Sequence, residues 1–316
     1  MLPRVVCRYR DDPAQKYGPF PPSLRFAVDS IPTEMDNRKV TLNDIGAGGC
    51  VIKGASRDLS KRVCTVHLCI RVKGEQIIDP YVILRSASLS ADRRDAPFIT
   101  RKNVNFKGVR APEASFYPQG IEIRWIPKAW LSDDVAHDWA KNFVEKTKHL
   151  LEDHDLDRPP YIAIQQDGLA AQNMKHVRQL YWFNNIFIVR PPGQCTDCLA
   201  MIDDEIGHGY KNILNEMLWD EMVEKPDMRC FLNEKLSSSD KRILMCIYAQ
   251  KAWEKTKVKH NLFKKIAKRM GFFNCRCGCE NHFVNVGRLV DYNFPVYGSF
   301  RVKTMTLKRK EKTKKC

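Results

Sequence analysis

The sequence predicts an α/β protein with a mixed five-stranded sheet flanked by helices, followed by a basic helical C-terminal extension. Three observations predict it. Apolar runs separated by a tight turn occupy the first part of the chain, which is typical of an antiparallel meander. From residue 132 onward, helical and strand-like segments alternate, which is typical of a sheet covered by helices. Beyond residue 226, lysine-rich helical patterns and a cysteine cluster follow.

The first three strands are expected at residues 24–31, 62–72 and 77–84. The run LRFAVDSI is apolar except for Asp29 near its end. The run RVCTVHLCIRV alternates with period two and so has one apolar face. Lys73 and Gly74 then turn the chain into the third strand.

A helix is expected to begin after Ser132, whose side chain can cap it, with Asp133 and Asp134 suiting its positive N-terminal dipole. Strands at 161–165 and 185–189 then alternate with helices at 170–183 and 203–223. The predicted sheet therefore receives two more strands, each followed by a helix.

The glycine-rich stretch at residues 46–54 (GAGGCVIKG) does not have the spacing of a nucleotide-binding loop. It lacks the third glycine of a dinucleotide fingerprint, and Ala55 and Ser56 follow where a phosphate loop requires Lys and then Ser or Thr. We interpret it as a turn between strands and expect no nucleotide cofactor.

Positive charge is concentrated at the C-terminus. Residues 251–316 contain 18 Lys and Arg against 4 Asp and Glu, which accounts for +14 of the net +16. Basic helices are expected at 239–255 and 258–270, and the sequence ends in LKRKEKTKKC, typical of a flexible cationic arm or a nuclear-import signal. These features predict DNA as a partner. The candidate contacts are Lys264, Lys265, Lys268, Arg269, Lys308, Arg309 and Lys310.

Aromatic residues lie between these cations, and they can either stack on exposed bases or face the core. For Trp253, Phe263, Phe272 and Phe273 the core is the favoured interpretation. No apolar stretch is long enough to span a membrane, and the N-terminus has no apolar signal core. We expect an intracellular, nuclear protein without a membrane partner, in which most cysteines are reduced and buried.

Three aspartates have positions that suit metal-dependent chemistry: Asp29 in the first strand, Asp167 at the end of the strand IAIQQD, and Asp203 at the start of a helix. Carboxylates from neighbouring strands and a facing helix can converge, and hard oxygen ligands suit Mg²⁺. Two such ions can activate a water and stabilise the leaving oxygen of a phosphodiester. The alternative is that each aspartate only caps or turns the chain.

Three blocks at these aspartates resemble the catalytic domain of DDE superfamily endonucleases, the transposases of the pogo and Tc1/mariner superfamily. They are YGPFPPSLRFAVDSIP, YIAIQQDGLAAQ and NIFIVRPPGQCTDCLAMIDDEIGHGYK. Their order and the interval between Asp167 and Asp203 are similar to those of the family. The resemblance covers roughly residues 17–225. Gly207 and Lys211 match the family's pattern when Asp203, rather than Asp204, is its third aspartate.

The resemblance implies an RNase H-like fold, with carboxylates on the first strand, after the fourth strand and on a following helix. It implies that Asp29, Asp167 and Asp203 hold Mg²⁺ or Mn²⁺. In the implied mechanism, water cleaves a phosphodiester at a transposon end and the freed 3′-hydroxyl attacks target DNA. We expect a lead-in at 1–22, the catalytic domain at 23–225, a helical, cysteine-containing extension at 226–300 and a flexible tail at 301–316. Homo-oligomerisation stays open.

The chain departs from the family pattern at Gly168, where the family commonly has Asn, and at Ala200 and Met201, where it has Gln and Pro. Loss of polar neighbours typically weakens a metal site. Only 28 residues precede Asp29, whereas transposases of this type carry helix-turn-helix domains there, so a fragment or a truncated copy is expected. The alternative function is a catalytically decayed remnant that binds nucleic acid.

Two cysteine groups are candidate metal ligands. Cys195 and Cys198 form a Cys-x-x-Cys pair, but both lie inside the third block and no second pair with zinc-finger spacing is nearby. The second group, Cys275, Cys277, Cys279 and His282, is a legitimate zinc ligand set. Its one-residue spacing is tight, and reduced cysteines are the favoured interpretation there.

Overall fold

The computed structural model describes residues 20–34, 39–42, 50–53, 62–85, 98, 100, 113, 115–126, 129–152, 161–191, 200–224 and 237–272. A six-stranded sheet forms its centre, with strand order β6-β5-β4-β1-β7-β8. β1 (Arg25–Glu34), β4 (Arg62–Arg71) and β5 (Tyr81–Arg85) form the predicted antiparallel meander. β7 (Ile162–Gln165) and β8 (Ile186–Val189) extend the sheet in parallel with β1.

The sheet has one strand more than the five predicted. β6 (Glu122–Ile126) pairs in parallel with β5 at the edge of the sheet. Its first four residues alternate charged and apolar side chains, yet four of the five residues are buried. Arg124 is buried because it pairs with Asp138 at 2.7 Å and its guanidinium lies over the ring of Tyr81, so the charge has partners.

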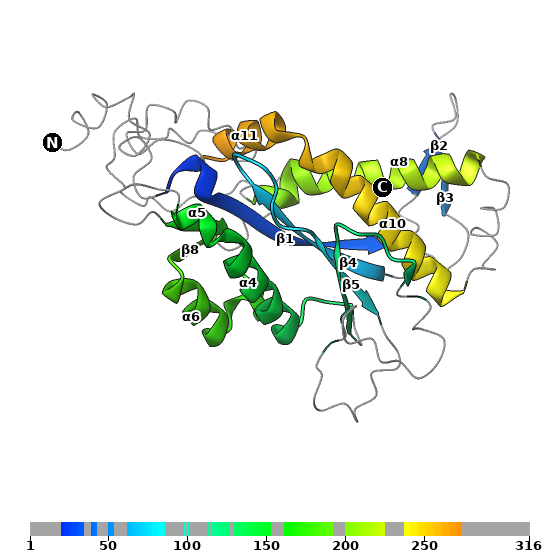
Figure 1. The fold of residues 1–316 in the computed structure, drawn as a ribbon. Coiled ribbons are helices and arrows are strands. Elements are labelled where there is room, and N and C mark those ends of the chain that lie inside the picture. Colours follow the sequence, from blue (N-terminus) through cyan, green and yellow to red (C-terminus); the bar gives the residue numbers. More distant parts are fainter. Residues whose placement is uncertain are drawn as a thin grey trace, which may run out of the picture.

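One face of the sheet is covered by α8 (Gly207–Glu224), α10 (Ser238–Lys257) and α11 (His260–Arg269), as Figure 1 shows. The alternating apolar side chains of β4 point to this side, as the sequence predicts. Tyr210 of α8, Trp253 of α10 and Phe263 of α11 are buried against them. The favoured interpretation of Trp253 and Phe263 as core residues is thereby confirmed.

The opposite face packs on α4 (Asp133–Thr147), α5 (His149–Glu152) and α6 (Lys175–Phe183). Ser132 caps α4 by accepting a hydrogen bond from the amide of Val135, and the predicted row Val135, Trp139 and Phe143 is buried. The helix predicted at 170–183 is instead a short 3-10 helix, η3 (Ala171–Asn173), followed by α6.

The remaining elements are smaller. The 3-10 helix η2 (Pro22–Leu24) leads into β1. β2 (Lys39–Leu42) and β3 (Cys50–Lys53) pair antiparallel on either side of residues 43–49, which lie outside the described residues. Cys64, Cys69 and Cys246 are buried in the core, as expected, and burial raises the pKa of the Cys69 thiol. In the described part of the chain, no helix has the length and apolar character needed to cross a bilayer.

Candidate active site

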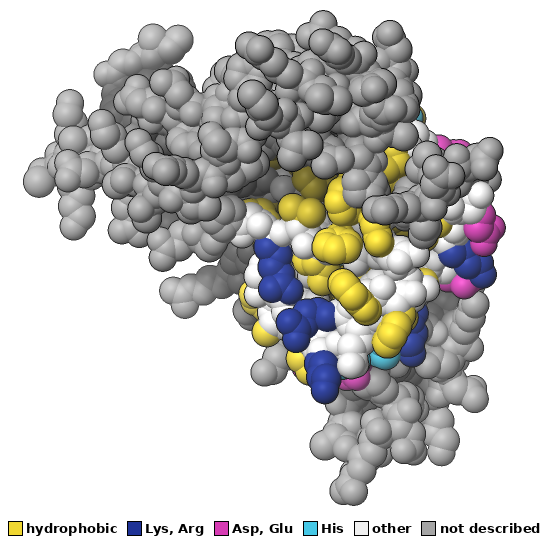
Figure 2. Space-filling model, turned by 90° about the vertical axis from the view of Figure 1, so that its left-hand side faces the viewer, with side chains coloured by type: hydrophobic (Ala, Val, Ile, Leu, Met, Phe, Trp, Pro, Cys, Tyr) yellow, Lys and Arg dark blue, Asp and Glu magenta, His cyan; other side chains and the backbone are white. Residues whose placement is uncertain are grey.

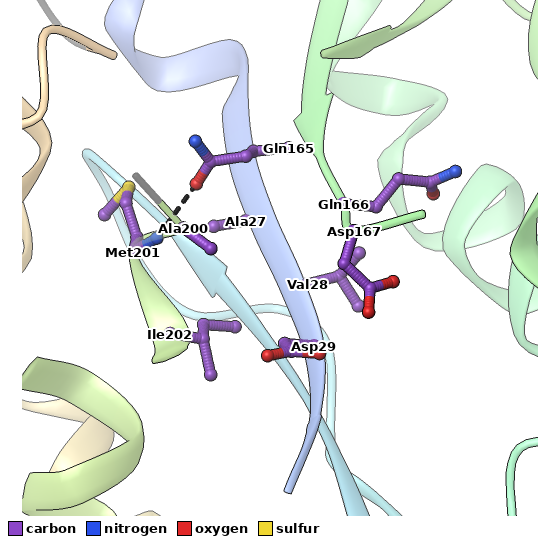
Figure 3. A pocket seen from close by; sticks show the side chains of 9 residues that line it. All are labelled: Ala27, Val28, Asp29, Gln165, Gln166, Asp167, Ala200, Met201 and Ile202. Atoms are coloured by element: carbon purple, nitrogen blue, oxygen red, sulfur yellow. Dashed lines mark hydrogen bonds between the residues drawn. The ribbon is translucent and has the colours of Figure 1, made fainter. Parts of the chain in front are cut away.

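Asp29 and Asp167 stand on the same face of two adjacent parallel strands. Ala27 of β1 pairs with Gln165 of β7, and each aspartate lies two residues further along its own strand direction. Because side chains alternate between the faces of a sheet with period two, Ala27, Asp29, Gln165 and Asp167 share one face. Figure 3 shows Asp29 between Ile202 on one side and Asp167 on the other.

Asp203 comes to this face on a π-helix, η4 (Ile202–Ile206), which continues directly into α8. Ile202 and Ile206 are buried while Asp203 is exposed, so apolar anchors on both sides fix the aspartate at the surface of the core. The entry to this helix is fixed by Gln165, whose side-chain oxygen accepts a 3.0 Å hydrogen bond from the amide of Met201 (Figure 3). π-turns of this kind are frequent at functional sites.

Asp29 is a buried carboxyl with a strongly raised pKa, about 9. Burial is the largest cause, followed by a hydrogen bond to Asp203 and the negative charge of Asp203, with a smaller contribution from Asp167. The Ser30 amide donates to Asp29 Oδ1 at 2.6 Å and opposes the rise. At neutral pH Asp29 is therefore protonated and shares its proton with the Asp203 carboxylate.

Asp167 lies at the end of β7 and is half-buried. Burial raises its pKa, and the charge of Asp203 raises it further. A 3.1 Å hydrogen bond from the Leu169 amide to Asp167 Oδ1 lowers it and fixes the carboxylate in a turn. Asp203 therefore interacts electrostatically with both of the other aspartates.

A pocket opens at this place, lined among others by Asp29, Asp167, Ala200 and Met201 (Figure 3). Among the residues that the structure describes, no three His, Cys, Asp or Glu side chains are already arranged as metal ligands. The donor set nevertheless fits a hard divalent cation, since it consists of carboxylate oxygens. Such a cation would replace the proton that Asp29 and Asp203 now share.

The positions that depart from the family pattern differ in their surroundings. Gly168 is exposed, and a Cβ built on it meets nothing within 4 Å, so the missing side chain leaves open space beside Asp167. Ala200 and Met201 are buried and line the pocket wall, which makes that wall apolar. The site therefore retains the three aspartates but has no polar side chain at positions 168, 200 and 201.

The basic residues named from the sequence divide into two groups. Lys264 and Lys265 are exposed on α11, and Lys268 and Arg269 are half-buried. Arg269 forms a 2.8 Å ion pair with Glu205 of η4, which ties the basic helix to the element carrying Asp203. Lys308, Arg309 and Lys310 lie outside the described residues. So do Cys195 and Cys198, as well as the proposed zinc ligands Cys275, Cys277, Cys279 and His282.

Two contributors to the site were missed at the sequence level. Gln165 lies two residues before Asp167, and period-two alternation alone would have placed it on the same face. Glu205 has no comparable signal, because its partner Arg269 is distant in sequence and the contact exists only once α11 has packed.

A family model described as DDE superfamily endonuclease matches residues 61–265, a range that includes Asp167 and Asp203. A solved chain from the "Crystal structure of the Mos1 mariner paired end complex with Mn" is 10% identical, with a TM-score of 0.34. The alignment covers 86% of the present chain and spans 60% of the length of that chain. No curated protein matches.

The strand order and the placement of the acids agree with the fold that the resemblance implies. Asp29 lies on the first strand, Asp167 directly follows β7, and Asp203 lies on the helix after β8. The predicted mixed sheet flanked by helices is confirmed, with a sixth strand, β6, at its edge. Because of β6, Asp167 follows the fifth strand of the sheet along the chain and not the fourth. Because the family model matches more than half of the chain, the protein belongs to the DDE superfamily endonucleases.

Proposed function

We propose that the protein is a metal-dependent DNA endonuclease and polynucleotidyl transferase of transposon origin. The observation that carries this proposal is the meeting of Asp29, Asp167 and Asp203 on one sheet face, where Asp203 raises the pKa of both other aspartates. The family to which the chain belongs supports the same chemistry.

In this proposal, the carboxylates of Asp29, Asp167 and Asp203 hold Mg²⁺ or Mn²⁺, which when bound activates a water or 3′-hydroxyl and stabilises the leaving oxygen. The protein's own residues supply position and charge. Asp29 gives up the proton it shares with Asp203, so that both present negative oxygens. Gln165 and the Leu169 amide keep the η4 segment and the Asp167 carboxylate in place.

DNA is the proposed substrate because exposed cations lie on the helix that is tied to η4, the element carrying Asp203. Lys264 and Lys265 are exposed on the helix that Arg269 ties to η4. The C-terminal residues 251–316 contain 18 Lys and Arg against 4 Asp and Glu, which suits a phosphate backbone. The terminal basic run also supports localisation to the nucleus, which contains DNA.

A nicking assay tests the proposal. Supercoiled plasmid is incubated with the full chain and Mg²⁺ or Mn²⁺, beside Asp167→Asn and Asp203→Asn. We expect both substitutions to reduce nicking by more than about 100-fold, since even loss of a group outside the ligand set typically costs 10–100-fold. The control is Asp134→Asn, an exposed carboxyl on α4, which packs on the opposite face. Equal nicking by all four proteins would contradict the proposal.

The second candidate is a non-catalytic nucleic-acid-binding remnant. Two observations favour it: the empty space at Gly168, and the absence of a ready three-ligand group among the described residues. It predicts that wild type and Asp203→Asn bind DNA with the same steep salt dependence while neither nicks it. Metal-dependent nicking by the wild type alone would exclude it.

A further inference from the structure

Large apolar side chains are exposed at the β8 edge of the sheet. The exposed fraction is 67% for Trp182, 43% for Phe187 and 38% for Val189. Edge strands with exposed apolar side chains invite unwanted pairing, so a functional reason is expected where they persist. We call Tyr161, Trp182, Phe187 and Val189 the β8 aromatic surface.

Tyr161, Phe187 and Val189 lie on the face of the sheet that carries the carboxylates. Trp182 belongs to α6 on the opposite face, and its ring contacts Phe187 at the β8 edge. Phe187 pairs with Ala163 and Val189 with Gln165 across parallel strands, and Asp167 follows Gln165 at the next position on that face. Neighbouring strands are about 4.8 Å apart. The exposed side chains therefore continue the row that contains Asp29 and Asp167, one strand beyond β7.

The rings support one another and so present fixed planes. Phe187 contacts Tyr161 with ring centroids 5.5 Å apart and Phe20 at 5.6 Å, and Trp182 lies 6.2 Å from Phe187. Such edge-to-face and tilted contacts hold aromatic side chains in place while leaving ring faces accessible. A planar group such as a base can therefore stack on rings that are already held in place.

The segment that carries Trp182, Phe187 and Val189 is basic. From Gly168 to Thr196 the sequence contains no Asp or Glu, whereas Lys175, Arg178 and Arg190 are present and exposed. Figure 2 shows hydrophobic side chains gathered on this side of the molecule with Lys and Arg beside them. Aromatic planes flanked by exposed cations match the combination of bases and phosphates in a nucleic acid.

We propose that the β8 aromatic surface binds an unpaired stretch of the DNA strand that enters the carboxylate site, by stacking its bases. The strand must be unpaired because ring faces reach bases only outside the duplex. A second copy of this chain is the disfavoured occupant, since a symmetric contact would bring Lys175, Arg178 and Arg190 against their own kind. That the bound strand is the one entering the carboxylate site rests on the proposed function. The stacking of bases on the rings does not depend on it.

The test compares a 20-nucleotide oligothymidylate with the same strand made abasic at every position, by fluorescence anisotropy without divalent metal. The abasic strand keeps the phosphates, so the ratio of the two dissociation constants isolates the bases from the basic tail. We expect the wild type to prefer the base-bearing strand by about tenfold or more, and Trp182→Ala to lose most of that ratio, because base stacking is worth about 1–3 kcal/mol per base.

Two further variants make the result specific. Trp182→Phe keeps a ring and should retain most of the preference. Phe116→Ala is the matched control: Phe116 is 64% exposed and adjoins Tyr117, which packs on Trp125 of β6 at the other edge of the sheet. It should leave the ratio unchanged.

An unchanged ratio in Trp182→Ala, or a wild type without preference for bases, would overturn the inference. Concentration-dependent dimerisation that Trp182→Ala abolishes would instead assign the surface to a second copy. Binding is measured without metal, so the base preference can be determined even if the protein does not nick DNA. Conversely, loss of the base preference would not decide the proposed nuclease activity, which the comparison of wild type with Asp203→Asn tests separately.

Discussion

Asp29 is an acid placed where an apolar residue would be more stable. Its neighbours on the same face, Ala27 and Ile31, belong to the core, and Asp29 itself is only 6% exposed. A lone carboxylate cannot be buried cheaply, so the group keeps its proton and donates it to Asp203. The cost of this arrangement depends on pH.

Replacing Asp29 by Asn should stabilise the metal-free protein more as the pH rises. The folded pKa is about 9 against a reference value of 3.8, so ionisation of the unfolded chain removes stability from the wild type as pH rises from about 4 to 9. Asn does not titrate. One pKa unit is worth about 1.4 kcal/mol, so we expect the advantage of the variant to grow by at least about 1 kcal/mol between pH 5 and pH 8.

Chemical denaturation in the presence of a chelator measures this difference, because groups common to both proteins cancel. Added Mg²⁺ should stabilise the wild type and leave Asp29→Asn unaffected. A constant difference in unfolding free energy across this pH range would show that Asp29 is ionised in the folded protein.

Gly168→Asn should be accepted by the fold and strengthen the metal site. A Cβ at Gly168 meets no atom within 4 Å, and its φ is not in the left-handed range, so the free energy of unfolding should change by less than about 0.5 kcal/mol. An amide beside Asp167 can orient that carboxylate, and such groups typically change metal affinity by about 10–100-fold. Calorimetric titration with Mn²⁺ measures the gain. Unchanged Mn²⁺ affinity would mean that the glycine at position 168 does not weaken metal binding.

At the scale of elements, the π-helix η4 determines where Asp203 lies. Its extra residue in the turn brings the Ile202 carbonyl close to Gly207, whose amide donates back to it. A Cβ at Gly207 would lie 2.5 Å from that oxygen and 3.4 Å from Ile31 Cδ1. Only glycine allows this close approach of the two backbones.

Gly207→Ala should therefore destabilise the protein and disturb the site. The alanine methyl cannot be accommodated without moving η4, so we expect a loss of about 2 kcal/mol or more in unfolding free energy. Gly209→Ala, two residues further along α8 and with open space around a Cβ, is the control and should be neutral or slightly stabilising. Similar melting temperatures for the two variants would refute a structural role for the π-turn.

Period-two and helical patterns predicted the elements that hold the site. The face of β4 and the buried row of α4 follow directly from alternation and helical spacing, and the order of the three aspartates places them on the correct elements. β6 was missed because the burial of its Arg124 depends on Asp138 from another element, α4. The π-turn was missed because it depends on the close approach of the Gly207 and Ile202 backbones, which no hydrophobic pattern records.

At the scale of the whole molecule, the C-terminal extension belongs to the core as far as α11. Tyr248 and Trp253 of α10 are buried on the sheet, and Arg242 forms an ion pair with buried Glu113 at 2.7 Å. Composition marks α10 and α11 as basic, but the helices contribute to the structure as well as to charge. The boundary predicted at residue 226 therefore marks a change in composition. Helices α10 and α11 beyond it pack on the same sheet as the elements before it.

Removal of residues 301–316 separates the charge of the tail from that of the folded body. These residues contain eight Lys and Arg against one Glu, nearly half of the net +16 of the chain. Their composition predicts a flexible cationic arm, so thermal unfolding should be unchanged. Each phosphate contact contributes about 0.9 to the slope of log affinity against log salt on duplex DNA. If the tail makes about half of eight possible contacts, the slope should fall by three to four.

The matched variant Lys264→Gln/Lys265→Gln keeps the tail and removes two exposed cations beside η4. It should reduce the slope by less than about two, yet lower nicking at a DNA concentration that saturates binding, because these cations are exposed on the helix that Arg269 ties to η4. If the double variant changes neither the salt slope nor nicking while truncation lowers the slope, the folded body has no phosphate-binding surface at α11, and the tail alone brings DNA to the protein.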